Sequence, residues 1–228
     1  MDFVAVTSQL WYIVAMKFSE LVEIVGDEPL FETGLLVAGD VDFAALRKQL
    51  SRWTAASKLF QLRRGLYALA PPFQKIKPHP FVVANHLVQG SYVSCQSALA
   101  YYGMIPEHAP VVVSVTNARP GRWDTPLGSF LFRHIKKDLL NGYRLVQLGG
   151  RQRAFVASPE KALLDLLYLQ PGADDSGYLR ELRLQNLHTL DTDKLRRMAS
   201  ATERPKLMRA AKTIAGLASS ENLEYEPL

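Results

Sequence analysis

Four prolines between positions 71 and 80 divide this chain of 228 residues into two regions. Pro71 and Pro72 precede the segment FQKIK, and Pro78 and Pro80 follow it. Proline lacks a backbone donor and restricts the residue before it, so helices and strands should stop here. The length suffices for a small domain joined to a medium one, each with its own core. We therefore predict an N-terminal extension at 1–15, a first domain at 16–72, a linker at 73–80 and a second domain at 81–228.

Apolar residues at helical spacing fill the first region up to residue 55. The segment KFSELVEIV predicts one helix, with Ser19 as its candidate N-cap. The segment EPLFETGLLVAGD predicts a second short helix that ends at Gly39. A third helix should begin after Asp42, because aspartate is a good N-cap. Its buried side is expected to consist of Phe43, Leu46, Leu50 and Trp53.

After this helix the pattern changes to that of two short strands. The segments KLFQL and LYAL are joined by Arg63, Arg64 and Gly65, and glycine can take the positive φ of a tight hairpin. Three helices followed by a hairpin predict a winged helix-turn-helix, in which the third helix enters the major groove of DNA.

The distribution of charge supports a polyanionic partner for this region. Between Asp42 and Lys77 the chain has eight Lys or Arg residues and no further carboxylate, and the next acid is Glu107. The net charge of +5 is therefore concentrated locally, as in nucleic-acid-binding proteins. The candidate DNA-binding residues are Arg47, Lys48, Ser51, Arg52, Lys58, Arg63 and Arg64.

Two less specific interpretations of this basic face remain open. It could be an ordinary solvated surface, although such surfaces usually mix both signs of charge. It could also belong to a winged-helix module that binds a protein partner and never contacts DNA. The dependence of binding on salt separates DNA from a protein partner. Five phosphate contacts, from Arg47, Lys48, Arg52, Arg63 and Arg64, predict a log-log slope of about −4 to −5.

The second region predicts a mixed α/β domain with a small sheet and a C-terminal helical bundle, so the whole chain is predicted to be α+β. A helix is expected at 81–89, and a second should follow Ser94 as its N-cap and stop at Gly103. The segments VVVSVT, GSFLFRHI, YRLVQL and QRAFVAS read as strands. Ser158, Pro159 and Glu160 suit the first turn of a buried helix. Further helices are expected at about 175–185, 192–200 and 204–217.

Basic residues outnumber acids again in the predicted C-terminal helices. These basic residues could simply form the solvated surface of a helical bundle. Alternatively, they could form a second basic surface that binds DNA, RNA or an acidic face of a toxin. The residues of this candidate second basic surface are Arg196, Arg197, Arg204, Lys206, Arg209 and Lys212.

The sequence does not predict an enzyme, a metal site or a cofactor. The five histidines are scattered, and no pair has the spacing of metal ligands. Cys95 is the only cysteine, and we expect it to be a small core residue. Lys161 and Asp165 lie four residues apart and are expected to form an intrahelical pair worth a few tenths of a kcal/mol.

Cysteine usage and the N-terminal segment bear on location. A single cysteine excludes an internal disulfide, which fits a reducing cytoplasm. The apolar run before Met16 is shorter than the roughly 20 residues of a membrane-spanning helix, and Asp2 is unlike the positive start of a secretory signal. We therefore predict a cytoplasmic protein with no membrane partner, in which either Met1 or Met16 is the native start.

Four segments of the chain together resemble the AbiEi antitoxins of bacterial type IV toxin-antitoxin systems. They are RRGLYAL, YVSCQSALAYYGMI, VVVSVTNARPGR and ASPEKALLDLL, in this order and approximate spacing, and the resemblance spans roughly 16–170. It implies a winged-helix domain that binds inverted repeats in its own promoter as a repressor. It also implies a second domain that counters a nucleotidyltransferase-like toxin, without needing a stoichiometric complex with it. The apolar segment FETGLLVAG departs from the family's usual polar second helix.

Overall fold

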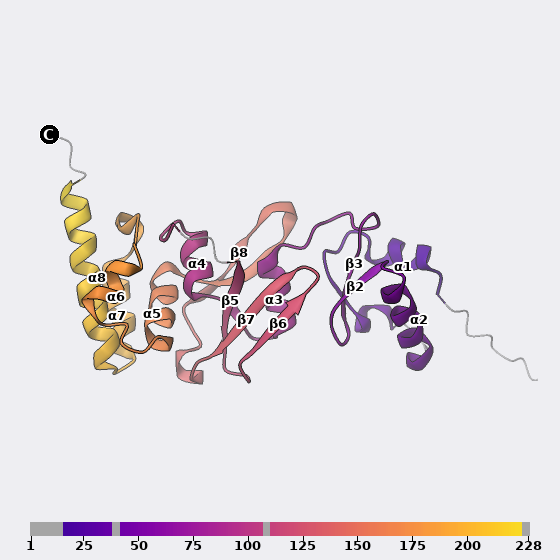
Figure 1. Ribbon diagram of the computed structural model, residues 1–228, viewed down its shortest axis with the longest axis horizontal. Coiled ribbons are helices and arrows are strands. Elements are labelled where there is room, and N and C mark those ends of the chain that lie inside the picture. Colours follow the sequence, from indigo (N-terminus) through magenta and orange to yellow (C-terminus); the bar gives the residue numbers. More distant parts are fainter. Residues whose placement is uncertain (1–15, 38–41, 107–109, 225–228) are drawn as a thin grey trace, which may run out of the picture. The chain divides into compact units, whose positions relative to one another are not determined.

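The computed structural model describes residues 16–37, 42–106 and 110–224 of the chain. The chain divides into two compact units, Met1–Lys77 (unit 1) and Pro78–Leu228 (unit 2), and the division falls within the predicted linker. Helices and two separate sheets occur together, so the predicted α+β class is confirmed (Figure 1).

Unit 1 combines two helices, one 3-10 turn and a three-stranded sheet in the described residues. The strand order is β1-β3-β2, and both pairings are antiparallel. The elements are α1 (Phe18–Val25), β1 (Phe31–Glu32), the 3-10 turn Thr33–Leu36, α2 (Phe43–Ala55), β2 (Leu59–Arg63) and β3 (Leu66–Leu69).

Helix α2 begins as its sequence predicts. The carboxylate of Asp42 accepts hydrogen bonds from the backbone N–H groups of Ala44 (2.8 Å) and Ala45 (3.3 Å), which would otherwise lack partners at a helix N-terminus. Leu46 and Leu50 are buried in the core of the unit. The predicted buried side is wrong at one position, because Phe43 lies in the first turn and is 53% exposed.

Two other local predictions for unit 1 are wrong. Helix α1 has Lys17 rather than Ser19 at the N-cap position, and the carboxylate of Glu20 accepts from the Lys17 N–H at 2.8 Å. The predicted second helix is a short strand followed by a 3-10 turn, because Phe31 pairs with Tyr67 of the hairpin instead of coiling. Its predicted end at Gly39 lies outside the described residues.

The hairpin of unit 1 confirms the prediction. Strands β2 and β3 are antiparallel, and Gly65 has a φ of +82° at the turn. The register shifts between Gln61 and Arg63, which is the signature of a β-bulge. The bulge and the turn place Arg63 and Arg64 at the tip of the hairpin.

Unit 2 contains a six-stranded mixed sheet, which is larger than the small sheet that we predicted. Its order is β6-β7-β5-β4-β9-β8, with parallel pairing between β5 and β7 and between β4 and β9. The strands are β4 (Tyr92–Val93), β5 (Val111–Thr116), β6 (Gly121–Thr125), β7 (Gly128–His134), β8 (Tyr143–Gln147) and β9 (Arg153–Ala157). Both edge strands, β6 and β8, belong to hairpins.

The helices of unit 2 follow the predicted order. They are α3 (Pro80–Leu87), α4 (Cys95–Tyr101), α5 (Pro159–Leu169), α6 (Ser176–Glu181), α7 (Thr192–Ala201) and α8 (Pro205–Glu224), with 3-10 turns at Lys137–Leu139, Gly149–Arg151 and Leu187–Thr189. Helix α5 contacts α4, α7 and α8, and α7 packs along α8. Every residue of α5 from Glu160 to Leu167 is buried, so this helix is the centre of the unit.

The two serines predicted as caps in unit 2 behave differently. The hydroxyl of Ser158 accepts from the Lys161 N–H, with Pro159 at the first helical position, as predicted for α5. Ser94 occupies the N-cap position of α4, but its hydroxyl makes no capping hydrogen bond and donates instead to Asp165.

Among the described helices, none is long and apolar enough to cross a membrane.

We expect the two units to fold separately, since each has its own apolar core. A fragment of residues 78–228 should unfold in one cooperative urea transition, monitored by circular dichroism. A fragment of residues 16–77 should fold with marginal stability, because domains of about 60 residues bury a smaller fraction of their surface. A disordered 78–228 fragment would contradict the division.

Candidate nucleic-acid interface

Helix α2 presents a basic outer face. Arg47, Lys48, Ser51 and Arg52 are all exposed, as predicted from their positions opposite the buried leucines. Residues four apart on a helix are neighbours, so Arg47 lies beside Ser51 and Lys48 beside Arg52 in two adjacent rows. The helix has 13 residues and is therefore about 20 Å long.

A hollow of about 500 Å³ lies between this face and the hairpin. Arg47 and Ser51 reach it from α2, and Arg64 and Gly65 reach it from the turn between β2 and β3. The structure therefore brings together three of the predicted site residues from two elements. The complete lining is Thr33, Arg47, Ser51, Gln61, Arg64, Gly65 and Tyr67.

The wall of this hollow contains hydrogen-bonding groups in addition to the cations. The amide of Gln61 donates to the hydroxyl of Tyr67 at 3.3 Å. Burial raises the pKa of Tyr67, although the nearby Arg47 lowers it, so the phenol stays protonated at neutral pH. The hollow thus offers two guanidinium groups, hydroxyls and an amide, with no carboxylate in its lining.

Two of the predicted DNA-binding cations have other contacts. Arg63 forms an ion pair with Glu32 of β1 at 2.8 Å, and Lys58 places its ammonium 4.8 Å from the centre of the Phe18 ring. Both side chains are half-buried rather than exposed. The sequence could not reveal these contacts, because Glu32 and Phe18 precede the acid-free stretch and approach it only in the folded unit.

Four of the predicted cations remain available to a ligand. Within the described residues, Arg47, Lys48, Arg52 and Arg64 form no ion pair, and all four are exposed. Lys75, by contrast, pairs with Asp27 at 3.3 Å. The basic surface that the structure supports is therefore smaller than the run of charge in the sequence, and it is concentrated on α2 and the hairpin tip.

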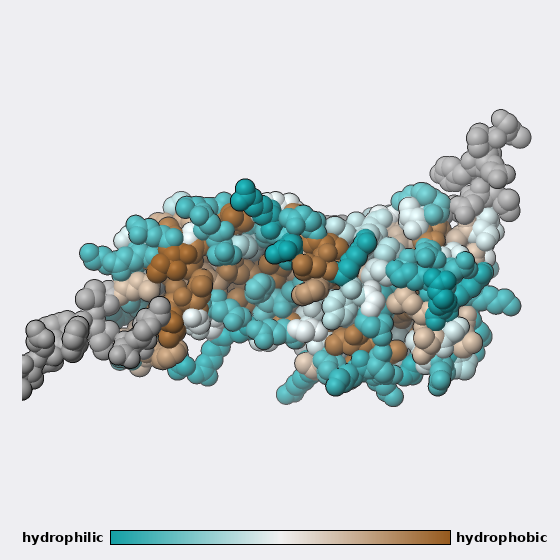
Figure 2. Space-filling model, turned by 180° about the vertical axis from the view of Figure 1, so that it is seen from behind, coloured by the Kyte–Doolittle hydropathy of each residue, from teal (hydrophilic) through white to brown (hydrophobic). Residues whose placement is uncertain are grey.

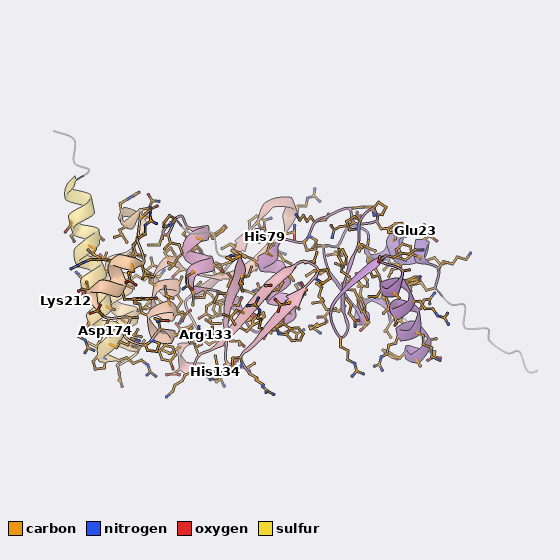
Figure 3. The ribbon with its side chains drawn as sticks, viewed as in Figure 1. Glu23, His79, Arg133, His134, Asp174 and Lys212 are labelled. Carbon is orange, nitrogen blue, oxygen red and sulfur yellow. The ribbon has the colours of Figure 1, made fainter. Side chains whose placement is uncertain are left out.

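The candidate second basic surface in unit 2 is partly neutralised. Arg209 pairs with Asp174 at 2.6 Å, and Arg196 lies 3.6 Å from Asp193. Arg204 stacks its guanidinium 4.9 Å from the ring centre of Tyr168, and Lys206 donates to the backbone carbonyl of Gln170. Arg197 and Lys212 are exposed. Figure 3 labels Asp174 and Lys212 among the C-terminal helices. Figure 2, seen from behind the view of Figure 1, shows hydrophilic residues interspersed with hydrophobic patches.

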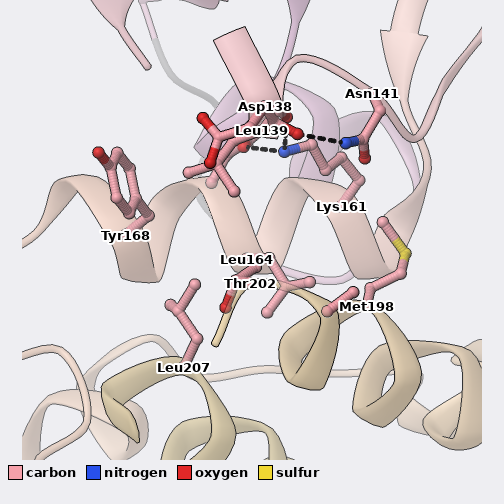
Figure 4. Close-up of a pocket in the computed structure, with 11 residues that line it drawn as sticks. Asp138, Leu139, Asn141, Lys161, Leu164, Tyr168, Met198, Thr202 and Leu207 are labelled. Carbon is pink, nitrogen blue, oxygen red and sulfur yellow. Dashed lines mark hydrogen bonds and ion pairs between the residues drawn. The ribbon is translucent and has the colours of Figure 1, made fainter. Parts of the chain in front are cut away.

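A buried charged network at α5 was missed by the sequence prediction. The ammonium of Lys161 donates to Asp165 Oδ1 and to the carbonyl of Leu139, both at 2.6 Å (Figure 4). Asp165 Oδ2 accepts from the hydroxyls of Ser94 at 2.7 Å and Tyr92 at 3.1 Å. The predicted intrahelical pair therefore forms, but the side chains of Lys161 and Asp165 are only 5% and 2% exposed, so it is a buried pair.

Burial and hydrogen bonds act oppositely on the carboxyls of this helix. Burial raises the pKa of Asp165, against the lowering effect of Lys161, Ser94 and Tyr92. Burial would also raise the pKa of Glu160, but hydrogen bonds from Lys194 (2.8 Å) and Ser158 (2.7 Å) outweigh it and lower the pKa. Each carboxylate satisfies its oxygens internally. The network therefore joins elements together and does not present a free acid or base.

The remaining candidate groups have structural surroundings. Cys95 is buried, and burial raises its pKa, as expected for a core thiol. His79 is the N-cap of α3, with Nδ1 accepting from the Phe81 N–H at 3.1 Å. In the parts of the chain that the structure describes, no group of His, Cys, Asp and Glu residues is arranged to hold a metal ion.

Comparisons of the sequence with protein-family models and with curated proteins found no match. The resemblance to AbiEi antitoxins therefore remains a prediction from the four motifs.

We expect Lys161→Met to destabilise the protein by about 3 to 5 kcal/mol, because it leaves the Asp165 carboxylate buried and unpaired. Lys161→Met with Asp165→Asn should recover part of this loss, since the second change removes the charge. The control is Arg209→Met, which breaks an exposed pair and should cost under about 1 kcal/mol. Urea unfolding measures all three free energies. Equal losses for Lys161→Met and Arg209→Met would contradict a buried pair.

Proposed function

We propose that unit 1 is a winged helix-turn-helix that binds double-stranded DNA, with α2 as its recognition helix and the β2–β3 hairpin as its wing. On this proposal the protein binds inverted repeats in its own promoter and acts as a transcriptional repressor. The observation that carries it is the group of four exposed, unpaired cations on α2 and the hairpin tip, Arg47, Lys48, Arg52 and Arg64, among the described residues.

The arrangement of these cations suits DNA. An α-helix fits the major groove, which is about 12 Å wide, and exposed basic and small residues on its outer face can approach base edges. Lys48 and Arg52 are one turn apart on α2, so one or both can reach a guanine edge. Arg64 at the hairpin tip is placed for a backbone phosphate, as in the wings of such domains. The hollow between α2 and the hairpin, which Arg47 and Ser51 line, accommodates the DNA strand that passes from the recognition helix to the wing.

The competing function is a winged-helix module that binds a protein partner. Such a module would also tolerate an exposed basic helix. It would not, however, release the several counterions that a duplex releases when phosphates are neutralised. The salt dependence of binding therefore distinguishes the two functions directly.

We further propose that unit 2 makes the protein an antitoxin of the AbiEi kind, which counters a nucleotidyltransferase-like toxin. The support is the set of shared motifs, three of which form β4 with α4, β5 with the start of β6, and α5. Two of these motifs meet in the structure, since Tyr92 and Ser94 of the first donate to Asp165 of the third. Their co-occurrence in one chain thus has a physical reason.

Phosphate contacts from Arg47 and Arg64 predict a slope of about −1.8 for the logarithm of DNA affinity against the logarithm of salt concentration. The slope reaches about −3.6 when Lys48 and Arg52 also neutralise phosphates. Arg47→Ala and Arg64→Ala should each weaken binding and reduce that slope by about 0.9. Arg63→Ala should change the slope less, because its guanidinium is already paired with Glu32. Fluorescence anisotropy on a duplex of the upstream promoter measures these values.

The control for this series is Lys75→Ala, which removes an exposed cation of unit 1 that pairs with Asp27. Its slope should equal that of the unaltered protein. A slope near zero for the unaltered protein, or no binding to the promoter duplex, would favour the protein-interaction module.

The two proposed activities should separate at the boundary between the units. A fragment ending at Lys77 should bind the promoter weakly and fail to protect cells, because the resemblance assigns protection to the second domain. A fragment starting at Pro78 should protect cells from the toxin when expressed from a foreign promoter, while its own promoter stays active. Growth and a promoter reporter, measured during co-expression with the neighbouring toxin gene, test both. Protection by the full chain alone would show that unit 1 takes part in it.

A further inference from the structure

A hollow of about 340 Å³ lies in unit 2, on the face of the sheet that α4 and α5 cover. Strands β5 and β7 supply its apolar wall with Val113 and Leu131, and Leu166 of α5 completes it. Three polar side chains also line it: Arg133 of β7, Gln96 of α4, and Gln170 just beyond the end of α5. Its volume is at the lower end of the range of small-molecule sites, which are mostly apolar with a few polar groups.

Among the described residues that line the hollow, Arg133 is the only charged one. Arg133 and Leu131 are two positions apart on β7, so their side chains point to the same face of the sheet. Arg133 is half-buried, and its guanidinium donates one hydrogen bond, to the carbonyl of Leu169 at 3.4 Å. A guanidinium has five N–H donors, so most of its hydrogen-bonding capacity is left for a ligand. Figure 3 labels Arg133 at the end of β7.

No acid of the described residues neutralises this cation. Arg133 forms no ion pair there, and the lining contains no carboxylate. Cys95 also lines the hollow, but burial raises the pKa of its thiol, so it is not a thiolate partner. Asp165, which lies near Cys95, is occupied by Lys161, Ser94 and Tyr92. A partly buried cation without a nearby counterion attracts an anion more strongly than a fully solvated cation does, because less water screens it.

We propose that this hollow is a binding site for a small monocarboxylate with an apolar body. The carboxylate accepts the two parallel N–H bonds that a guanidinium offers, which is the geometry that arginine provides and lysine does not. The apolar body lies against Val113, Leu131 and Leu166. The carboxamides of Gln96 and Gln170 flank the carboxylate and add donors without adding charge. A phosphate would leave most of its charge opposite apolar walls, so one arginine favours a single negative charge.

Hexanoate tests the proposal as a probe with both required parts, and acetate and 1-hexanol each lack one of them. Isothermal titration calorimetry on the full chain should show saturable millimolar binding of hexanoate. 1-Hexanol should bind at least about tenfold more weakly, since a hydrogen bond to a charged group contributes more than one factor of ten. Acetate should bind at least about tenfold more weakly as well, since it lacks the methylene groups that hexanoate buries against the apolar wall. Hexanoate should also raise the melting temperature of the protein. No saturable binding of hexanoate, or equal binding of 1-hexanol, would overturn the proposal.

Two variants locate the site within the molecule. Arg133→Gln should weaken hexanoate binding by about tenfold or more. Gln170→Glu should do the same without disturbing the fold, because Gln170 is exposed and the new carboxylate competes for Arg133. The matched control, Arg122→Gln, removes an exposed arginine of β6 outside the hollow and should leave binding unchanged. Unchanged hexanoate affinity in folded Gln170→Glu, or an equal loss in Arg122→Gln, would show that hexanoate binds elsewhere.

Discussion

The buried ion pair between Lys161 and Asp165 determines how unit 2 is assembled. A carboxylate and an ammonium that are almost completely buried are stable only when their remaining hydrogen-bonding groups are satisfied. Here Tyr92 of β4, Ser94 at the start of α4 and the carbonyl of Leu139 supply those partners. One pair on α5 therefore fixes the positions of a central strand, a second helix and the 3-10 turn before β8. Loss of either charge would disturb all of them.

In unit 1 the described charged residues stabilise no buried core and lie on the surface instead. Its core is formed by apolar residues such as Leu21, Leu50 and Leu59, and its cations lie on the surface. Glu32 and Asp27 pair with Arg63 and Lys75, so among the described residues of unit 1 the exposed cations without an ion pair are concentrated on α2 and the hairpin tip. A surface of this kind is what phosphate recognition needs, since attraction to a polyanion depends on charges without near neighbours of opposite sign.

Local patterns in the sequence predicted the elements whose causes are local. The Asp42 cap, the hairpin turn at Gly65 and the Ser158 cap all depend on residues within a few positions of one another. The second helix of unit 1 was predicted wrongly, because Phe31 pairs with Tyr67, which lies far along the chain. Spacing identified Lys161 and Asp165 as a pair, but not their burial. That burial depends on Ser94 and Tyr92, about seventy residues earlier.

The same distinction applies to the candidate sites. Arg47, Lys48 and Arg52 could be assigned to an outer face from helical periodicity alone, and the structure places them there. Arg133 could not be selected from the sequence, where it is one of many arginines. It is distinguished by its position, because β7 directs it beneath the end of α5 into a hollow whose described lining residues include no acid. A charged side chain therefore indicates a candidate binding site when no side chain of opposite charge lies near it in the folded structure. The sequence alone does not show where this is the case.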